Sequence, residues 1–493
     1  MSVQTVDQFT LGFFGSLPVV IEPRAVQLSS DAGLLAVREF DDKIGFTRGF
    51  VACLNDARDP DALRHSLREM VSQRLFGAIA GYEDCNDHDG LRTDPIFKLI
   101  SGQSPEGRDL ASQPTLSRFE NAVDIASLWR LHEFFVDDFI RSFAVPPTSL
   151  TLDIDPLDDP CHGQQQLALF HGFYGQYQYL PLAISCAETQ DILYPALRPG
   201  NMHASLGADD DLEFVVSRLR RAWPDVQIHV RGDAGCGVPW MYEVCERLGV
   251  HYTFGLSANA VLQKWTDVLV EAACQEFERT HQPQRCFDEF WYRAGTWPDH
   301  RRVVVKVEHN AQGSNRRFVV TNRPVGPLDP GVVYDAYAER GEAENRNKEL
   351  KCGISADRLS CHRFVANYFR LLLYAAALNL TNRLRRLCAD PPPLTELKLG
   401  ATTAVPVRDP TLSVAALEAE ERRRYHNYRC RLDPLGEGHL ETWRRMFLKV
   451  AAEVRQSARR ILVIIPSQWP YLEWCVRVWR CIARLGGAPY AVT

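Results

Sequence analysis

Four side chains between Tyr337 and Lys351 have types and a spacing that could do chemistry on an anion. At about 100° per residue they fall within about 60° of one another on an α-helix, in a stripe roughly 20 Å long. They are Tyr337, Arg340, Glu344 and Lys351. A carboxylate among cations on one face suits a metal ion that handles a polyanion. Because Glu, Arg and Lys are also good helix formers, an ordinary solvated helix face is the alternative.

The spacing Tyr-x2-Arg-x3-Glu-x6-Lys resembles the signature around the third catalytic carboxylate of bacterial insertion-sequence transposases of the DDE class. The resemblance implies an α/β fold with an RNase H-like, retroviral-integrase-like core, in which Asp, Asp and Glu bind two divalent ions, Mg²⁺ or Mn²⁺. It assigns Glu344 as the third metal ligand. It also implies that Tyr337, Arg340 and Lys351 contact DNA near the scissile bond. Two aspartates must then lie upstream, at the ends of strands.

The composition sets limits on the function. With 493 residues, the chain is long enough for two or three domains. Its net charge of -6 gives no global signal for nucleic acid, so any DNA contact must use local patches. The 14 cysteines show no zinc-finger spacing, which indicates thiols in a reducing compartment.

The chain has the features of a soluble cytoplasmic protein. Its first residues lack a basic segment followed by an apolar run, so we expect no signal peptide. The most apolar predicted helix, 364–380, is interrupted by Arg370 and is too short and polar for a membrane span. We therefore expect no membrane partner.

The middle of the chain predicts the element order of an RNase H-like fold: three strands, helix, strand, helix, strand. Alternating and apolar runs give this order. The strands are expected at 149–155, 165–173, 179–186, 226–233 and 251–256, and the helices near 209–222 and 238–248.

Two strand ends offer the upstream aspartates. Asp153 and Asp155 point to the same face of the first strand. The transposases usually show Asp-x-Thr here with the strand-final Asp as ligand, which favours Asp155, although Pro-Leu follows it in this chain. Asp233 follows an apolar strand beside glycines, a usual place for a ligand, with a helix-capping turn residue as the alternative. Asp158 and Asp159 fit turn or capping positions.

The first 145 residues are predicted to be mainly helical. Two segments, 81–95 and 112–121, suit a helix-turn-helix near 93–121, with Ser117 and Arg118 as exposed donors to DNA. An ordinary helical bundle is the alternative. Both segments also resemble the N-terminal region of insertion-sequence group thirteen-eighty, which implies binding to terminal inverted repeats.

Two further regions flank the core. Antiparallel strands within 279–330 resemble the β-rich insertion of the Tyr-Arg-Glu-Lys transposases, where Trp297 could stack on an extruded base. A core tryptophan is the alternative for Trp297. After a long helix near 361–387, basic helices are expected at 418–431 and 443–460.

These observations predict four regions and one function. The regions are a helical DNA-binding domain (1–145), a catalytic core (146–278 and 331–390), a β-rich insertion (279–330) and a helical basic C-terminal region (391–493). The expected function is divalent-metal-dependent cleavage of double-stranded DNA at terminal inverted repeats and strand transfer into target DNA, by at least a homodimer. The alternatives are a catalytically inactive transposase-derived DNA-binding protein and an RNase H-like DNA nuclease.

Overall fold

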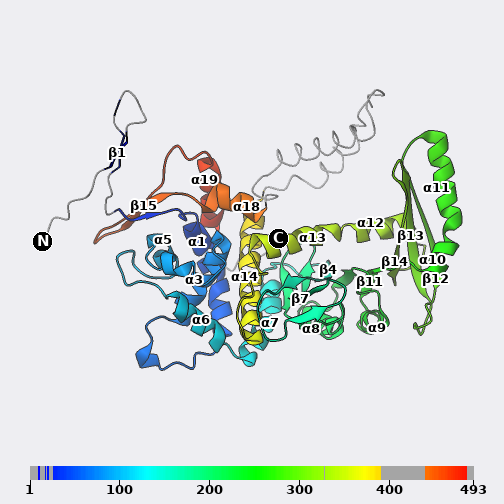
Figure 1. Ribbon diagram of the computed structural model, residues 1–493, viewed down its shortest axis with the longest axis horizontal. Helices are drawn as coiled ribbons and strands as arrows, with labels where there is room; N and C mark the ends of the chain where they lie inside the picture. The colour runs from blue at the N-terminus through cyan, green and yellow to red at the C-terminus, as the bar shows by residue number, and fades with distance from the viewer. Residues whose placement is uncertain are drawn as a thin grey trace.

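The computed structural model describes residues 9–11, 17, 19–21, 26–326, 328–389 and 439–485. Its described parts comprise a group of N-terminal helices, a long central helix and a sheet that extends away from it (Figure 1). The helix expected at 418–431 lies outside the described residues.

The N-terminal region is mainly helical, as predicted. Its helices are α1 (Leu34–Ile44), α2 (Phe46–Ala52), α3 (Leu67–Ala80), α4 (His88–Leu91), α5 (Pro95–Ile100), α6 (Gln113–Ala122) and α7 (Ile125–Arg141), with a short 3₁₀ turn at Pro60–Ala62. Three short strands precede them: β1 (Phe9–Leu11), β2 (Val19–Ile21) and β3 (Leu28–Ser29). Ser66 caps α3 by accepting from the Glu69 amide at 3.1 Å, and Gly81 ends that helix with a positive φ of 91°.

The central helix α14 (Phe364–Cys388) organises this region. Its residues from Phe369 to Arg385 are buried, so its apolar surface faces neighbours on every side. It packs against α3, α6 and α7 on one hand and strand β9 on the other. Figure 1 shows it in yellow between the N-terminal helices and the sheet.

A mixed sheet of eight strands forms the rest of the fold, in the order β12-β13-β14-β11-β10-β4-β8-β9. The strands are β4 (Ser149–Pro156), β8 (Leu182–Cys186), β9 (Ile192–Ala196), β10 (Gln227–Gly232), β11 (His251–Leu256), β12 (Gln284–Tyr292), β13 (Arg301–Asn310) and β14 (Gly313–Thr321). Strands β4, β10 and β11 run parallel, and their other neighbours are antiparallel. Helices α8 (Ala208–Ala222) and α9 (Pro239–Arg247) connect strands of the sheet.

One strand prediction is wrong. The segment 165–173 contributes only β6 (Leu169–His171), in a small separate sheet with β5 (Asp159–Pro160) and β7 (Gln176–Tyr179). The third strand of the meander is instead β9, which sequence reasoning missed. Pro195 interrupts its apolar run, and a proline is tolerated there because β9 is an edge strand.

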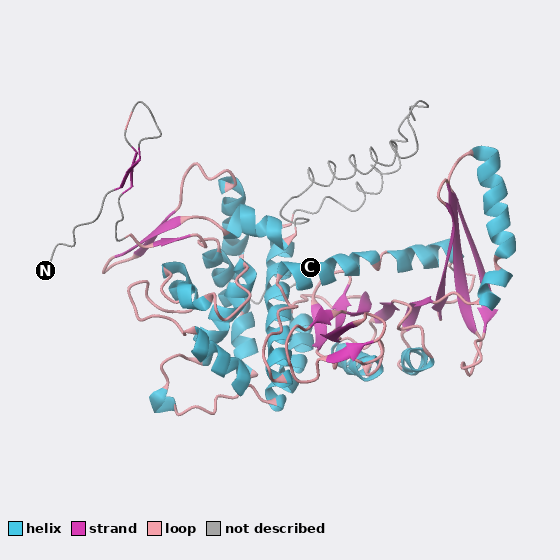
Figure 2. Cartoon of the chain, viewed as in Figure 1, coloured by secondary structure: helices cyan, strands magenta, loops and turns pink. Residues whose placement is uncertain are grey.

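The predicted β-rich insertion continues the main sheet. Thr253 to Leu256 of β11 pair with Thr321 to Phe318 of β14, so the hydrogen-bonded ladder runs on into the β12–β14 meander. Helices α10 (Ala260–Trp265) and α11 (Asp267–Thr280) precede the meander. Figure 2 shows α11 along its outer side and a helix returning from it toward the middle of the molecule.

The helix predicted over 443–460 is wrong beyond Leu448. Helix α18 (Leu440–Trp443) passes into a π turn (Arg444–Leu448), followed by β15 (Ala452–Gln456), β16 (Ile461–Ile464) and α19 (Leu472–Arg484). Ala452 and Val454 are buried at a period of two, and β15 pairs with β3 from the other end of the chain. This long-range pairing overrides the local helix preference.

Candidate functional site

Two of the predicted acids lie side by side at one edge of the sheet. Ile154 of β4 is paired with Gly232 of the parallel strand β10, so Asp155 and Asp233 occupy the next position of each strand. The carboxyl ends of parallel strands meet at the same edge, where ligands of α/β sheets bind. The strand register thus places the two aspartates at neighbouring strand ends, and their role as metal ligands stays a prediction.

Asp153 and Asp155 have different roles in the structure. The Asp153 carboxylate is buried and accepts hydrogen bonds from Arg231 Nε at 2.7 Å and Nη2 at 3.0 Å, and it also pairs with Arg346. Two guanidinium groups therefore use its oxygens. Asp155 accepts only from Arg340 Nη1, at 2.7 Å, and its Oδ2 is buried with no hydrogen-bond partner among the described residues.

The electrostatics of Asp155 follow from its burial. Desolvation raises the pKa of its carboxyl to about 7, although Arg340 opposes the shift, and the nearby charges of Asp153 and Asp233 add to it. A strand-end carboxyl with a raised pKa and an unpartnered oxygen is typical of a functional group.

The single helical stripe expected from Tyr337 to Lys351 is interrupted in the structure. Helix α12 (Pro330–Ala338) ends before Arg340, α13 (Gly341–Lys348) starts after it, and a π turn covers Glu349–Gly353. The prediction of one continuous helix is therefore wrong. Gly341 at the start of α13, with its weak helix preference, fits the break.

The break still brings three of the four side chains together with Asp233. Tyr337, Arg340 and Glu344 line one cavity of about 350 Å³ with Asp233. Arg340 lies between two carboxylates, because its Nη2 is 3.5 Å from Glu344 Oε1 while its Nη1 binds Asp155. The Glu344 side chain is 72% exposed, so it stands at the open side of the site.

Lys351 lies apart from this group. Its Nζ donates to Asp158 Oδ1 at 3.0 Å, and it is not among the residues that line the cavity. The turn after β4 therefore holds Lys351 beside the site through a half-buried ion pair.

A glycine gives the site its close packing. A Cβ on Gly255 of β11 would lie 2.8 Å from the Tyr337 hydroxyl and 2.8 Å from the Ala234 amide. Only glycine lets α12 and the loop after Asp233 approach this strand, which is a sequence signal for the site that could have been used.

The acids fit a divalent metal in kind. Three carboxylates supply the hard oxygens that Mg²⁺ prefers, and the unpartnered Asp155 Oδ2 offers a free donor. Within the described residues, however, no three His, Cys, Asp or Glu side chains lie close enough to hold an ion. In this conformation the Arg340 guanidinium occupies the place between Asp155 and Glu344.

Trp297 is a core residue and not a base-stacking one. Its side chain is 6% exposed and packs against Tyr242 and Tyr292, with Arg301 over its ring. The prediction that it stacks on DNA is wrong, because the residues of the β-rich segment and α9 cover the indole.

The predicted helix-turn-helix is not formed by the two helices within 93–121. Helices α5 and α6 are joined by residues 101–112, much longer than the roughly three- or four-residue turn of that motif, and α5 is largely buried. Arg118 is exposed on α6 and lines a cavity of about 530 Å³ with other arginines, whereas Ser117 lies outside that lining.

Sequence reasoning missed the cationic wall of the cavity that Asp233 and Glu344 line. It consists of Lys306 of β13 and Arg317 of β14; Arg316 also borders the cavity, but its guanidinium turns away to Gln263 and Asp267. The alternation of basic and apolar residues in Arg301–Asn310 and Gly313–Thr321 was the available signal, since it places these cations on known faces of a meander.

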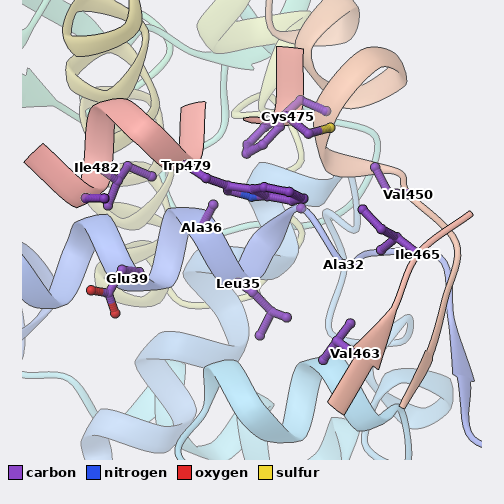
Figure 3. A pocket seen from close by; sticks show the side chains of 13 residues that line it. Ala32, Leu35, Ala36, Glu39, Val450, Val463, Ile465, Cys475, Trp479 and Ile482 are labelled. Atoms are coloured by element: carbon purple, nitrogen blue, oxygen red, sulfur yellow. The ribbon is translucent and has the colours of Figure 1, made fainter. Parts of the chain in front are cut away.

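The most apolar of the cavities that we describe lies elsewhere in the molecule. It has a volume of about 500 Å³ between α1, β16 and α19, and residues such as Leu35, Val463 and Trp479 line it (Figure 3). It contains one acidic side chain, Glu39, and none of the predicted catalytic residues.

Comparison with known proteins identifies the family. A model of the family described as transposase DDE domain group 1 matches residues 14–425. The chain therefore belongs to this family of DDE transposases. Among solved structures, a piggyBac transposase synaptic complex with hairpin DNA, determined by cryo-EM, is similar to the chain at 12% identity with a TM-score of 0.35, covering 80% of this chain and 90% of that chain. No curated protein matches the chain.

No helix in the described part of the chain is long and apolar enough to cross a membrane.

Proposed function

We propose that this family member is an active transposase of insertion-sequence group thirteen-eighty that cuts and joins DNA at the terminal inverted repeats of its element. The observation that carries the proposal is the placement of Asp155 and Asp233 at neighbouring strand ends, where Asp155 binds Arg340 and Asp233 lines a cavity with Arg340 and Glu344. Strand order β9-β8-β4-β10-β11, with acids at the ends of β4 and β10, supports an RNase H-like core.

The acids would hold the metal ions. Asp155, Asp233 and Glu344 would bind two Mg²⁺ or Mn²⁺ ions, which supply an activated water and stabilise the leaving 3′ oxygen. Asp155 has an oxygen free for this purpose, and Arg340 must leave its place between Asp155 and Glu344. Arg340 released in this way is available to a DNA phosphate, an exchange of one anionic partner for another.

The remaining residues would position DNA. Tyr337 lines the cavity beside Asp233, where its ring can contact the terminal nucleotide. Lys351, in a half-buried ion pair with Asp158, can exchange this partner for a phosphate. Arg118 and Ser117 on α6 are proposed to contact the terminal repeats, with the neighbouring arginine-lined cavity supporting this for Arg118. Synapsis of two ends requires at least a homodimer.

The four regions are proposed to divide these tasks. Residues 1–145 would bind the repeats, 146–278 with 331–390 would form the core, 279–330 would extend it along the DNA, and 391–493 would add basic contacts. The proposal for 391–438 and 486–493 rests on composition, because these residues are outside the described part of the chain.

A second candidate function is an inactive DNA-binding protein. The specific observation in its favour is that no group of three acidic, His or Cys ligands converges among the described residues. The two candidates differ in one measurable property, which is cleavage.

The test is Mg²⁺-dependent cleavage of a labelled duplex that carries the element's own terminal repeat. We expect cleavage at the repeat boundary by the wild type and loss of at least about 100-fold in rate for Glu344→Gln, because the amide cannot replace a charged ligand. Glu342→Gln, two residues away on the same helix and therefore on a different side of it, is the matched control and should retain activity. Cleavage that survives Glu344→Gln would place the active site elsewhere, and specific binding with no cleavage would favour the second candidate.

A further inference from the structure

A pair of like charges faces the catalytic cavity from the β13–β14 ladder. Lys306 of β13 and Arg317 of β14 are directly opposite in the antiparallel register. Like charges in this position destabilise a sheet unless an anion lies between them. Their presence beside a cavity that contains Asp233 and Glu344 calls for a functional reason.

Strand alternation shows that both cations face the site. Val304 and Val319 share a small apolar cluster with Tyr334 of α12, whereas Val305 and Phe318 belong to the core on the other side of the ladder. Lys306 and Arg317 lie two residues from Val304 and Val319, and therefore on the α12 face.

Arg316 is the contrasting neighbour. Its guanidinium donates to the Gln263 carbonyl, Thr266 and Asp267, all in or next to the helices α10 and α11 on the opposite face. Its charge is neutralised by Asp267 at 2.9 Å.

The cations of the cavity differ in how far they are already neutralised. Arg340 binds Asp155, and Lys306 pairs with Glu308 at 2.9 Å while its Nζ lies 4.8 Å from the centre of the Tyr334 ring. Arg317 is exposed, and its guanidinium makes no hydrogen bond or ion pair with the described residues. The Tyr334 ring fixes Lys306 in place, so one held cation and one available cation stand together.

We infer that Lys306 and Arg317 form a binding subsite for a backbone phosphate of the DNA strand whose scissile phosphate lies at Asp233 and Glu344. The inference rests on the proposed function and adds residues outside the Tyr-Arg-Glu-Lys signature. Successive phosphates follow one another by about 3.4 Å of helix axis per strand, so a strand that reaches the acids brings its neighbours to the cationic wall. The bound phosphate relieves the repulsion within the ladder and fixes which bond meets the acids.

The test compares Arg317→Gln with wild type in full-length protein, by fluorescence anisotropy with a terminal-repeat duplex at several salt concentrations and without divalent metal. Loss of one phosphate contact should weaken binding several-fold and reduce the slope of log affinity against log salt by about 0.9. Arg317→Lys should restore most of the slope. Arg279→Gln is the matched control, because this exposed arginine of α11 lies on the helix that covers the opposite face of the ladder.

A second measurement identifies the phosphate. Duplexes with a single neutral methylphosphonate, placed in turn at each position near the cleaved bond, should weaken binding to wild type at one or two positions. At those positions the same duplexes should not weaken binding to Arg317→Gln any further. This non-additivity would show that Arg317 and that phosphate interact.

The possible outcomes distinguish a failure of the phosphate subsite from a failure of the proposed transposase activity. A wild type that binds and cleaves, with an unchanged salt slope and unchanged methylphosphonate profile for Arg317→Gln, overturns the subsite alone. A wild type that binds the duplex without cleaving it, but shows the coupled position, supports the subsite and contradicts the transposase activity. A wild type that binds no DNA overturns both.

Discussion

Asp153 and Asp155 show how two identical side chains on one strand face acquire different tasks. The Asp153 carboxylate holds Arg231 of β10 and Arg346 of α13, and thus ties the signature helix to the sheet. The Asp155 carboxylate has one oxygen on Arg340 and one buried oxygen without a partner. Both oxygens of Asp153 are therefore used by guanidinium groups, whereas Asp155 keeps one oxygen that could bind a metal ion.

Removal of the charge should affect stability strongly at Asp153 and cleavage strongly at Asp155. Asp153→Asn leaves two buried guanidinium groups without their counter-ion and should lower the free energy of unfolding by about 3–5 kcal/mol. Asp155→Asn should change it by less than about 1 kcal/mol, because the desolvation that raises the pKa of the Asp155 carboxyl offsets its ion pair with Arg340, while abolishing cleavage. Urea unfolding of both variants beside the cleavage assay measures this. Equal stability losses would mean that the buried ion pairs of Asp153 are not maintained in solution.

At the scale of elements, the small sheet β5-β7-β6 contains an unusual acid. Asp159 of β5 is 3% exposed, and neither carboxylate oxygen has a hydrogen-bond partner among the described residues. Burial raises the pKa of this carboxyl to about 8, with the nearby charge of Asp357 adding to the shift and Lys351 opposing it. A turn or capping role, which the sequence suggested, does not describe a residue buried in this way.

The pH dependence of stability should report this residue. Between the ordinary pKa near 3.8 and the raised value near 8, the folded protein keeps the proton and the unfolded chain releases it. Stability should therefore fall as the pH rises from about 5 to about 8, and level off above that range. Asp159→Asn cannot ionise and should reduce this slope. Urea midpoints of both proteins at several pH values check it, and parallel slopes would contradict the assignment.

The sequence predicted those elements whose pattern is local. The strands that end in Asp155 and Asp233 have unbroken apolar or alternating runs, and β4, β10 and β11 were placed within about two residues. The strand β15 was mistaken for helix: it lies in a sheet between β16, which follows it, and β3, which lies more than 400 residues away in the sequence and gives no local signal. The break at Arg340 was missed because a spacing rule assumes one continuous helix.

The same distinction holds for the candidate site. Types and spacing identified the acids, since chemistry constrains them directly. They could not show that Arg340 would bind Asp155, because the two residues are 185 positions apart and meet only through the fold. Trp297 was misassigned for a related reason, because an aromatic residue has the same sequence appearance in a core and at a DNA contact.

At the scale of the whole molecule, the two ends of the chain share one core. Trp443 and Phe447 of the C-terminal segment lie in the same buried cluster as Phe40 of α1 and Leu372 of α14. Arg444 donates to the carbonyls of Ile79 and Ala78 at 2.8 Å each, and Lys449 pairs with the buried Asp31 at 2.7 Å. The described C-terminal residues therefore complete the N-terminal helical region.

This shared core predicts a global response to a C-terminal change. Trp443 is 1% exposed, so Trp443→Ala should lower the free energy of unfolding by about 3–5 kcal/mol. The control is Trp479→Ala, since that side chain is 41% exposed and should cost clearly less. Calorimetry should show the whole N-terminal region melting earlier in Trp443→Ala. Loss of a separate small transition alone would mean that the C-terminal segment folds independently.

The continuity of the sheet has a consequence for anyone who wishes to exchange parts between relatives. The meander β12–β14 is joined to β11 by a four-residue ladder from Thr253 and Thr321 to Leu256 and Phe318. A transplanted meander that enters one residue out of frame would present every side chain on the wrong side. Val305 and Val307 would then face α12, and Arg317 would point toward α11. Chimeras must therefore preserve the parity of residue count at both junctions, whatever the length of the transplanted segment.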